Sequence, residues 1–154
     1  MATFTTGVMP VYDLDFAIGT KGEESIDTDM KTIADMENFS MSITSDSQEW
    51  NPMDAKGWRR ILVTAKAITI SLSGKRNYGD AGNDYVSSLA LKNGRKCNSK
   101  LKLTFSNGDK LEMNCAVKVT NFLGGASTDV QPLEFDLESD GEPVFTEHTT
   151  TPAA

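Results

Sequence analysis

The sequence predicts a mainly β protein: a β-sandwich or flattened barrel with one short α-helix on its flank. Three observations support this prediction. Apolar and polar residues alternate in several separate segments, as expected of half-buried strands. An Asn-Gly dipeptide joins two of those segments, which is typical of a β-hairpin. Only one stretch has the spacing of an amphipathic helix, so helices cannot form a layer of their own.

Taken in order, the chain is expected to form about six to eight strands. The expected strands are Val11–Ile18, Ile33–Met36, Asn38–Thr44, a segment from Ile61 through Ser73, Leu101–Phe105, Leu111–Val119 and Val130–Ser139. The segments 20–30, 45–60 and 121–129 are polar or contain Gly and Pro, which predicts loops.

The best-specified local structure is the hairpin around Asn107-Gly108. A two-residue turn there would pair Leu103 with Glu112 and mix the two faces of the sheet. A three-residue loop, 106–108, keeps the faces separate. It pairs Leu103 with Leu111, Leu101 with Met113 and Lys102 with Glu112. We therefore expect the three-residue loop, with Gly108 at a positive φ.

The single expected helix covers about residues 83–92. Tyr85, Val86 and Leu89 have helical spacing, and Asn93-Gly94 supplies a stop signal. Gly79 and Gly82 are expected to end the preceding strand. A helix this short is not stable alone, so it should lie on the sheet.

A chain of 154 residues fits one domain, expected over residues 10–146. Residues 1–9 read as a flexible N-terminal segment and residues 147–154 as a disordered Thr/Pro-rich tail. The N-terminus lacks the basic start and apolar block of a signal peptide, and no apolar run is long enough to span a membrane. Cys97 and Cys115 form no metal or disulfide motif and are expected to be free thiols, one of them in the core.

Charge is arranged in blocks along the chain. Residues 1–54 carry a net charge of −9, residues 55–118 carry +9, and residues 119–154 carry −7. The plain interpretation is a solvated surface of mixed sign; the alternative is a molecule with opposite poles that stacks head to tail. The lysines of the basic block lie on alternating strands without aromatic platforms, so this block is a poor nucleic-acid site.

No pattern of catalytic residues is found, so we do not expect an enzyme, and we expect neither a cofactor nor a metal site. The single histidine, His148, lies in the tail, which disfavours a histidine triad or metal site. The sequence contains no phosphate loop, nucleophile elbow or HExxH motif. The GDAG stretch at 79–82 is better explained as a tight turn before a helix than as an anion site.

Two kinds of strand face are candidates for a special role. One is an acidic row opposite the apolar residues of 130–139, and the other is a hydroxyl row that recurs in two strands. The plain interpretation of the acidic row is a solvated outer face; the alternative is a surface that repels phosphate, which lysines would bind. The candidates are Glu134, Asp136, Glu138, Ser40, Ser42, Thr44, Thr69, Ser71 and Ser73.

The polar segment Gln48–Arg60 holds both tryptophans and two adjacent arginines. It looks too irregular for a strand or a helix and is expected to be a long loop. Tryptophan and arginine dominate protein–protein contacts, so we interpret this loop as a contact with another copy of the chain. The alternative is that both tryptophans fold back onto their own core. The residues concerned are Trp50, Asn51, Pro52, Met53, Asp54, Trp58, Arg59 and Arg60.

Four stretches resemble the major tail tube proteins of phages, in particular those of long-tailed phages and prophages of Gram-positive bacteria. They are GVMPVYDLDFAIGTKG, EWNPMDAKGWRR, SLSGKRNYGDAGNDYV and DVQPLEFDLESDGEP. The resemblance runs from about residue 7 to residue 145. The EWNPM…GW and GKRN…GNDYV stretches are specific, whereas the others are ordinary β sequence.

The resemblance implies a β-sandwich with a flanking helix and a structural role in the virion tail, assembled in the host cytoplasm. It implies hexameric rings, stacked into a tube, in which each subunit gives strands to an inner barrel. The implied partners are other copies of the chain and the tape-measure, tail-terminator and distal tail or baseplate proteins. DNA would only pass through, and no membrane is involved. The alternative is a monomeric β-sandwich binding module, such as a lectin.

Overall fold

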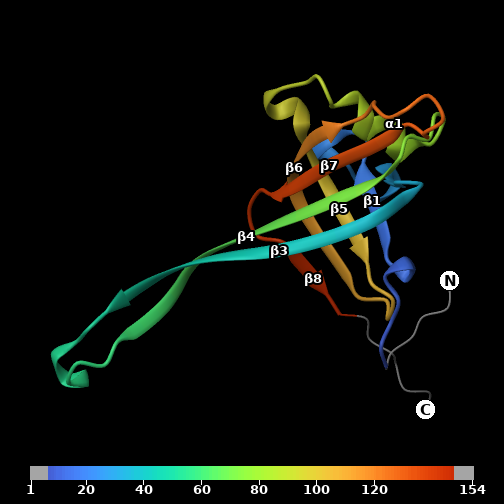
Figure 1. Cartoon of the computed structure of the whole chain (residues 1–154). Coiled ribbons are helices and arrows are strands. Elements are labelled where there is room, and N and C mark those ends of the chain that lie inside the picture. The colour runs from blue at the N-terminus through green and yellow to red at the C-terminus, as the bar shows by residue number, and fades with distance from the viewer. Residues whose placement is uncertain (1–6, 148–154) are drawn as a thin grey trace, which may run out of the picture.

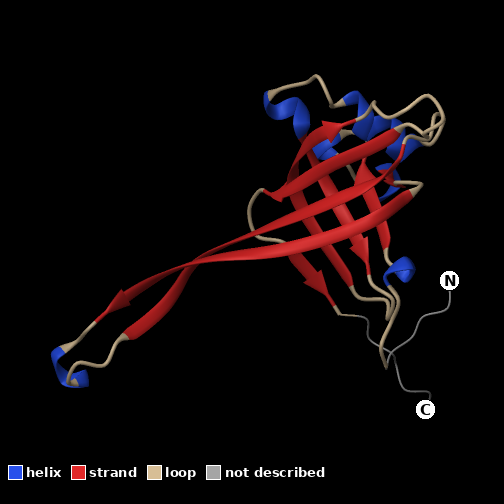
Figure 2. Cartoon of the chain, viewed as in Figure 1, coloured by secondary structure: helices blue, strands red, loops and turns tan. Residues whose placement is uncertain are grey.

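The structure, a computed structural model, describes residues 7–147. The flexible segment expected at 1–9 and the disordered tail expected at 147–154 therefore lie almost wholly outside the described residues. The described chain forms one antiparallel sheet in the order β2-β1-β5-β6-β7-β4-β3, with β8 paired to β6 (Figures 1 and 2). The strands are β1 (Asp15–Gly19), β2 (Met30–Thr32), β3 (Met36–Trp50), β4 (Arg60–Lys75), β5 (Asn98–Thr104), β6 (Lys110–Asn121), β7 (Pro132–Ser139) and β8 (Val144–Thr146).

The sheet curls until its two ends face each other across the core. Phe16 of β1 and Phe39 of β3 lie far apart in strand order, yet their ring centroids are 4.9 Å apart. Within the body of the sheet, the alternating apolar residues of the strands point into this flattened barrel, and most are at most 2% exposed. They include Ile18, Ile70, Leu72, Leu101, Leu103, Val117, Leu133, Phe135 and Leu137. The predicted mainly β class is confirmed.

The β5–β6 hairpin has the predicted register. Leu103 pairs with Leu111, Leu101 with Met113 and Lys102 with Glu112. The Phe105 amide donates to the Asp109 carbonyl at 2.7 Å, which closes the three-residue loop. Gly108 has a φ of 97°, a conformation that glycine adopts without steric cost.

The flanking helix α1 (Ala81–Ser88) is shorter than predicted and starts earlier. It starts at Ala81 because the Asp80 carboxylate accepts the Asn83 amide at 3.0 Å and acts as the N-cap. Gly82, expected to break the strand, lies inside the helix instead. A side chain there would come within 2.6 Å of the Thr32 carbonyl, so Gly82 lets α1 approach β2 closely. Val86 and Leu89 face the core as predicted.

Other boundaries differ from the sequence-based prediction. The strand expected from Val11 is a 3₁₀ turn, η1 (Val11–Asp13), followed by β1. The short strand expected at Ile33–Met36 is wrong: residues 33–35 connect β2, which ends at Thr32, to β3, which begins at Met36, and Ile33 is buried. The expected loop at 20–30 holds two further 3₁₀ turns, η2 (Gly22–Glu24) and η3 (Asp27–Asp29). No sequence signal predicted β8.

The two cysteines are free, as expected, and differ in environment. Cys115 is buried in the core, and this burial raises the pKa of its thiol to about 12. Cys97 is half-buried in η5 (Gly94–Cys97) and donates to the Lys92 carbonyl at 3.0 Å. None of the described helices is long and apolar enough to cross a membrane.

Candidate assembly surfaces

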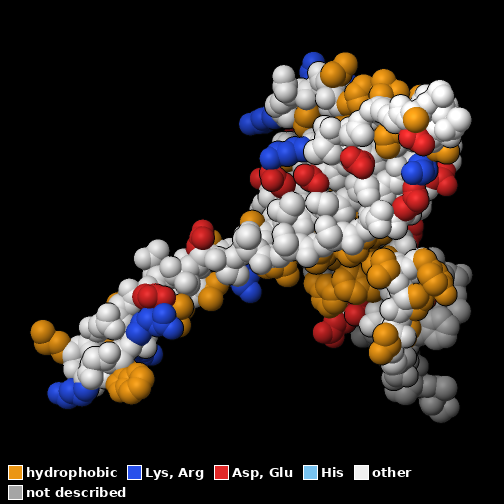
Figure 3. Space-filling model, in the orientation of Figure 1, with side chains coloured by type: hydrophobic (Ala, Val, Ile, Leu, Met, Phe, Trp, Pro, Cys, Tyr) orange, Lys and Arg blue, Asp and Glu red, His pale blue; other side chains and the backbone are white. Residues whose placement is uncertain are grey.

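The two strand faces singled out in the sequence join into one polar surface. In the register of β3, β4 and β7, one row runs Ser40, Ser71, Asp136 and the next runs Ser42, Thr69, Glu138. Ser73 and Glu134 extend the surface toward α1, and Thr44 extends it the other way. All of these residues alternate with core residues, so they point away from the core. Figure 3 shows the acidic side chains gathered over β7.

The basic block meets this surface at one position. Lys118 of β6 lies beside Asp136 in the ladder, and its amine pairs with the Glu138 carboxylate at 2.7 Å. Ser71 donates to Asp136 at 2.7 Å, so two of the three acids have a neighbour that orders them. With three carboxylates and one paired lysine on β6 and β7, this surface is net negative.

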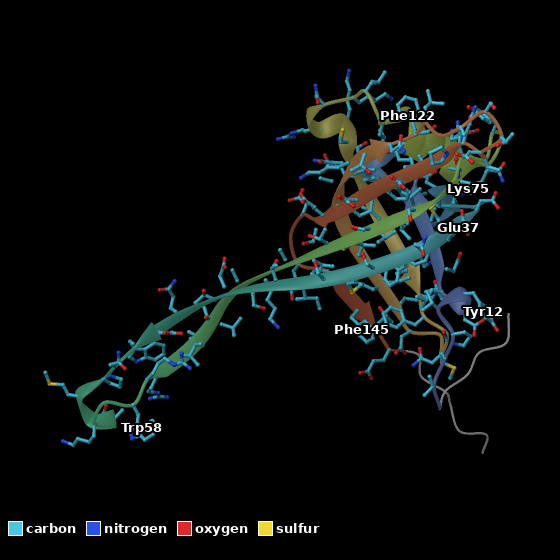
Figure 4. All side chains as sticks on the ribbon, in the orientation of Figure 1. Tyr12, Glu37, Trp58, Lys75, Phe122 and Phe145 are labelled. Atoms are coloured by element: carbon cyan, nitrogen blue, oxygen red, sulfur yellow. The ribbon has the colours of Figure 1, made fainter. Side chains whose placement is uncertain are left out.

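Similar pairs join the sequence's charge blocks elsewhere, which disfavours a simple division into two poles. Lys75 of the basic block pairs with Glu37 of the acidic N-terminal block at 3.0 Å, and both side chains lie near the β3 start in Figure 4. Arg59 likewise pairs with Glu49 at 2.9 Å. The folded chain thus brings basic and acidic blocks together within one subunit.

The predicted irregular loop at 45–60 was wrong in part: residues 45–50 and 60 are strand, whereas residues 51–59 form a turn. β3 and β4 continue past the body as a two-stranded ribbon, paired from Thr44↔Ala67 to Trp50↔Arg60. We call residues 44–67 the hairpin arm; it projects well away from the barrel (Figure 1). The alternation there is obscured because both faces are exposed and because a β-bulge shifts the register between Asp46 and Ser47.

Every predicted contact residue of this segment lies at the arm's tip. The turn contains η4 (Met53–Ala55), followed by Lys56 and Gly57, both at positive φ. Trp58 is 79% exposed and Met53 is 94% exposed. The tryptophans therefore do not fold back onto the core of their own subunit, and Trp58 lies at the far end of the arm (Figure 4). The remaining tip residues from the prediction are Trp50, Asn51, Pro52, Asp54, Arg59 and Arg60.

Contacts within the tip hold its basic side chains in place. The Arg59 guanidinium pairs with Glu49 across the ribbon, and the Arg60 guanidinium lies 6.0 Å from the centre of the Trp50 ring. Such exposed contacts contribute little stability. The tip thus presents an exposed tryptophan and methionine beside three bases, Lys56, Arg59 and Arg60, and two acids, Asp54 and the paired Glu49.

The GKRN…GNDYV stretch has a structural role that sequence reasoning missed. Asn83 is fully buried, and its amide donates to the Ala34 and Lys75 carbonyls at 3.2 and 3.0 Å. The Arg76 guanidinium donates to Asn83 and pairs with Asp84 at 2.7 Å. These bonds tie the start of α1 to the end of β4 and to the turn before β3. The sequence signal that could have predicted this role is the two asparagines and the arginine of this stretch, which lie close to the start of the helix.

Besides the short terminal strand β2, the edge of β3 and part of the edge of β6 lack a partner strand in the described chain. β3 is the last strand of the sheet, so one of its edges is free along its whole length. On β6, pairing with β5 ends at Ala116, whereas pairing with β7 continues to Asn121. The β6 edge from Val117 to Asn121 is therefore free on the side opposite β7. Unpaired edges readily take up a strand from another chain.

A groove of about 400 Å³ runs beside the free edge of β3, where the curled sheet does not close. We call it the seam. Its floor holds Phe16, Phe39 and Leu72, and Tyr12, 86% exposed, lies at its border. The charged side chains that line it are all acidic: Asp15, Asp35 and Glu37. No group of metal-ligating side chains is found within residues 7–147.

Comparison with solved structures shows a fold shared with tail and tube proteins. One match is to the tail of an empty gene transfer agent particle refined with C6 symmetry, with a TM-score of 0.69, 15% identity, and coverage of 91% of this chain and 100% of the other. A second is to the virion of a native gene transfer agent, with a TM-score of 0.67, 16% identity, and coverage of 91% and 100%.

A third match is to the sheath–tube complex of an extracellular contractile injection system in its extended state. Its TM-score is 0.57 at 14% identity, over 90% of this chain and 91% of the other. A search of curated protein sequences finds no match. The phage tail tube protein family matches residues 11–145, which is nearly the whole described chain. The chain therefore belongs to the phage tail tube protein family.

Proposed function

We propose that this chain polymerises as stacked six-subunit rings into the tube of a phage-like tail. Family membership and the C6 symmetry of a structurally similar tail support this proposal. The observation that carries it is the pair of free edges on β3 and β6. Strands β6, β7, β4 and β3 alternate in direction, so the β6 of one subunit meets the β3 of the next in antiparallel orientation.

Closing the ring in this way removes both exposed edges and gives each subunit four strands of a continuous inner barrel. The polar surface of β3, β4, β7 and β6 then lines the channel, because the core side of the same strands faces outward. Carboxylates at 134, 136 and 138 keep DNA phosphates from binding during passage. The tape-measure, terminator and distal tail proteins are further partners in this proposal, and assembly takes place in the host cytoplasm. No catalytic step is involved.

The hairpin arm serves stacking in this proposal. Its exposed tryptophan and bases lie far from the subunit's own body and fit a contact with an adjacent ring. A monomeric binding module would have no use for two free strand edges and a projecting ribbon. The lectin-like alternative therefore fits the structure less well than a polymerising subunit does.

The test of the arm uses Trp58→Ala combined with Arg59→Glu and Arg60→Glu, followed by thermal melting and negative-stain microscopy. We expect an unchanged melting transition and six-subunit rings that no longer stack. Ile43→Ala is a matched control near the base of the arm and should still give tubes. Wild-type protein that stays monomeric at every concentration, with its tape-measure and initiator proteins present, would refute the proposed function.

The test of the channel reverses the acidic row with Glu134→Lys and Asp136→Lys, which leaves the Lys118–Glu138 pair intact. Tubes should still form, because these side chains point away from the core, and DNA ejection should be slower because the lysines bind phosphate. Glu134→Gln with Asp136→Asn separates loss of repulsion from gain of attraction. An ejection rate equal to wild type in intact tubes would show that the row does not line the channel.

A further inference from the structure

The seam is an apolar groove that remains open in the isolated subunit. Phe16, Phe39 and Leu72 form its floor, and Asp15 and Glu37 are among its acidic side chains. Asp15 makes no ion pair within residues 7–147, and Glu37 has only the half-exposed Lys75 as its partner. An apolar groove with acidic sides is suited to an occupant that is apolar and basic.

Such a segment occurs in the same chain, at residues 91–97. Leu91 is 87% exposed, and Lys92, Arg95 and Lys96 are exposed with no ion pair among the described residues. We call this segment, which includes η5, the basic loop. It precedes Asn98 at the start of β5, whereas Asp15 of the seam pairs with Thr104 at the other end of β5, so a subunit does not bring the loop to its own seam.

The free edges fix where the basic loop lies relative to a neighbouring subunit. η5 leads directly into β5, and Asn98, the first residue of β5, pairs with Ala116. The basic loop therefore lies next to the point where the free edge of β6 begins, at Val117. The seam lies next to the free edge of β3, since Met36–Phe39 of that strand line it. Joining the two edges with Val117 beside Met36–Phe39 brings the loop of one subunit alongside the seam of the next.

We propose that the seam of each subunit receives the basic loop of the neighbouring copy in the ring. This inference rests on the proposed function and specifies its lateral contact. Leu91 covers Phe39, the half-buried member of the floor, while Arg95 and Lys96 face Asp15 and Glu37. The contact adds to the β3–β6 edge pairing, which alone is not selective, and it sets which edge belongs to which neighbour.

Charge reversal on each side tests the contact. The seam variant carries Asp15→Lys and Glu37→Lys, and the loop variant carries Arg95→Glu and Lys96→Glu. Each should raise the protein concentration needed for rings about tenfold or more, because like charges then face each other across the interface. Glu142→Lys with Glu147→Lys is the control for the same change of charge at exposed positions away from the seam; it should assemble as wild type does.

Mixing the two variants gives the decisive measurement. In an equimolar mixture every seam–loop contact can join opposite charges if the variants alternate, and a ring of six accommodates strict alternation. Ring formation, measured by light scattering and microscopy, should therefore recover to within about threefold of wild type. A variant that had merely misfolded could not be rescued in this way, and thermal melts check folding independently.

The outcomes separate this inference from the proposed function. If the wild-type chain forms rings and either charge-reversal variant forms them equally well, the seam–loop contact is overturned. The same holds if both variants are folded but their mixture fails to recover. Either result leaves the ring proposal standing. A wild-type chain that forms no rings under any condition would overturn both. We expect weakened ring formation by each variant alone and recovery in the equimolar mixture.

Discussion

The body of the subunit and the hairpin arm are built from the same two strands but are stabilised differently. In the body, β3 and β4 place Phe39, Ile70 and Leu72 on a shared core, and β4 is also paired with β7. In the arm, the same strands have only each other, and nearly every residue from 44 to 67 is exposed. A two-stranded ribbon without a core is at best marginally stable in water.

This contrast shows which contacts the isolated subunit lacks. The arm's exposed apolar residues include Ile61, Leu62 and Val63, each more than 50% exposed, in addition to the tip. Because successive strand residues point to opposite faces, both faces of the ribbon carry exposed apolar side chains, which is typical of an interaction site. In the proposed tube these side chains are covered by a neighbouring subunit, whereas the body has a core of its own.

Amide hydrogen exchange should show the largest difference between the two regions. In the free subunit, amides at 46–50 and 60–64 should exchange near the rate of an unfolded chain, because their only hydrogen bonds are cross-strand and solvent-accessible. Amides of β5 and β6 should exchange only on global unfolding, many orders of magnitude more slowly. In assembled tubes the arm should become protected. Arm amides that are as protected in monomers as those of β6 would contradict the contrast.

The sequence predicted the body far better than the arm, for a physical reason. Where one face of a strand is buried, alternation is enforced, and segments such as Leu101–Phe105 and 130–139 were recognised with the correct faces. In the arm neither face is buried within the subunit, so residues 45–50 carry no alternation. The bulge near Ser47 also breaks the period, and the segment was taken for a loop.

The candidate surfaces divide in the same way. The polar rows were found because they alternate with core residues, although their union into one surface depends on strand order, which periodicity does not encode. The tip residues were predicted from composition alone, since tryptophan and arginine, as at Trp58 and Arg59, suggest a contact whatever the secondary structure around them. The seam was missed because its walls, Asp15 and Glu37, come from strands at opposite ends of the sheet. The free edge of β6 was missed because it depends on where β5 ends.

Point substitutions sharpen the comparison in free energy. Phe135→Ala in β7 should lower the free energy of unfolding by about 3–5 kcal/mol, because it leaves a cavity among residues that are at most 2% exposed. Ile61→Ala in the arm should change it by no more than about 0.5 kcal/mol, since that side chain is 52% exposed and touches no core. Urea denaturation of the monomer measures both.

The ranking of these two substitutions should reverse when their effect on tube assembly is measured instead of their effect on the free energy of unfolding. Ile61→Ala should weaken tube formation by more than it weakens folding, because its apolar contacts are made with another subunit. Val144→Ala, at a side chain of similar exposure on β8, serves as the surface control for folding. If Ile61→Ala cost several kcal/mol in the monomer, the arm would be part of the subunit's own cooperative unit. The division between a self-sufficient body and an assembly-dependent arm would then have to be abandoned.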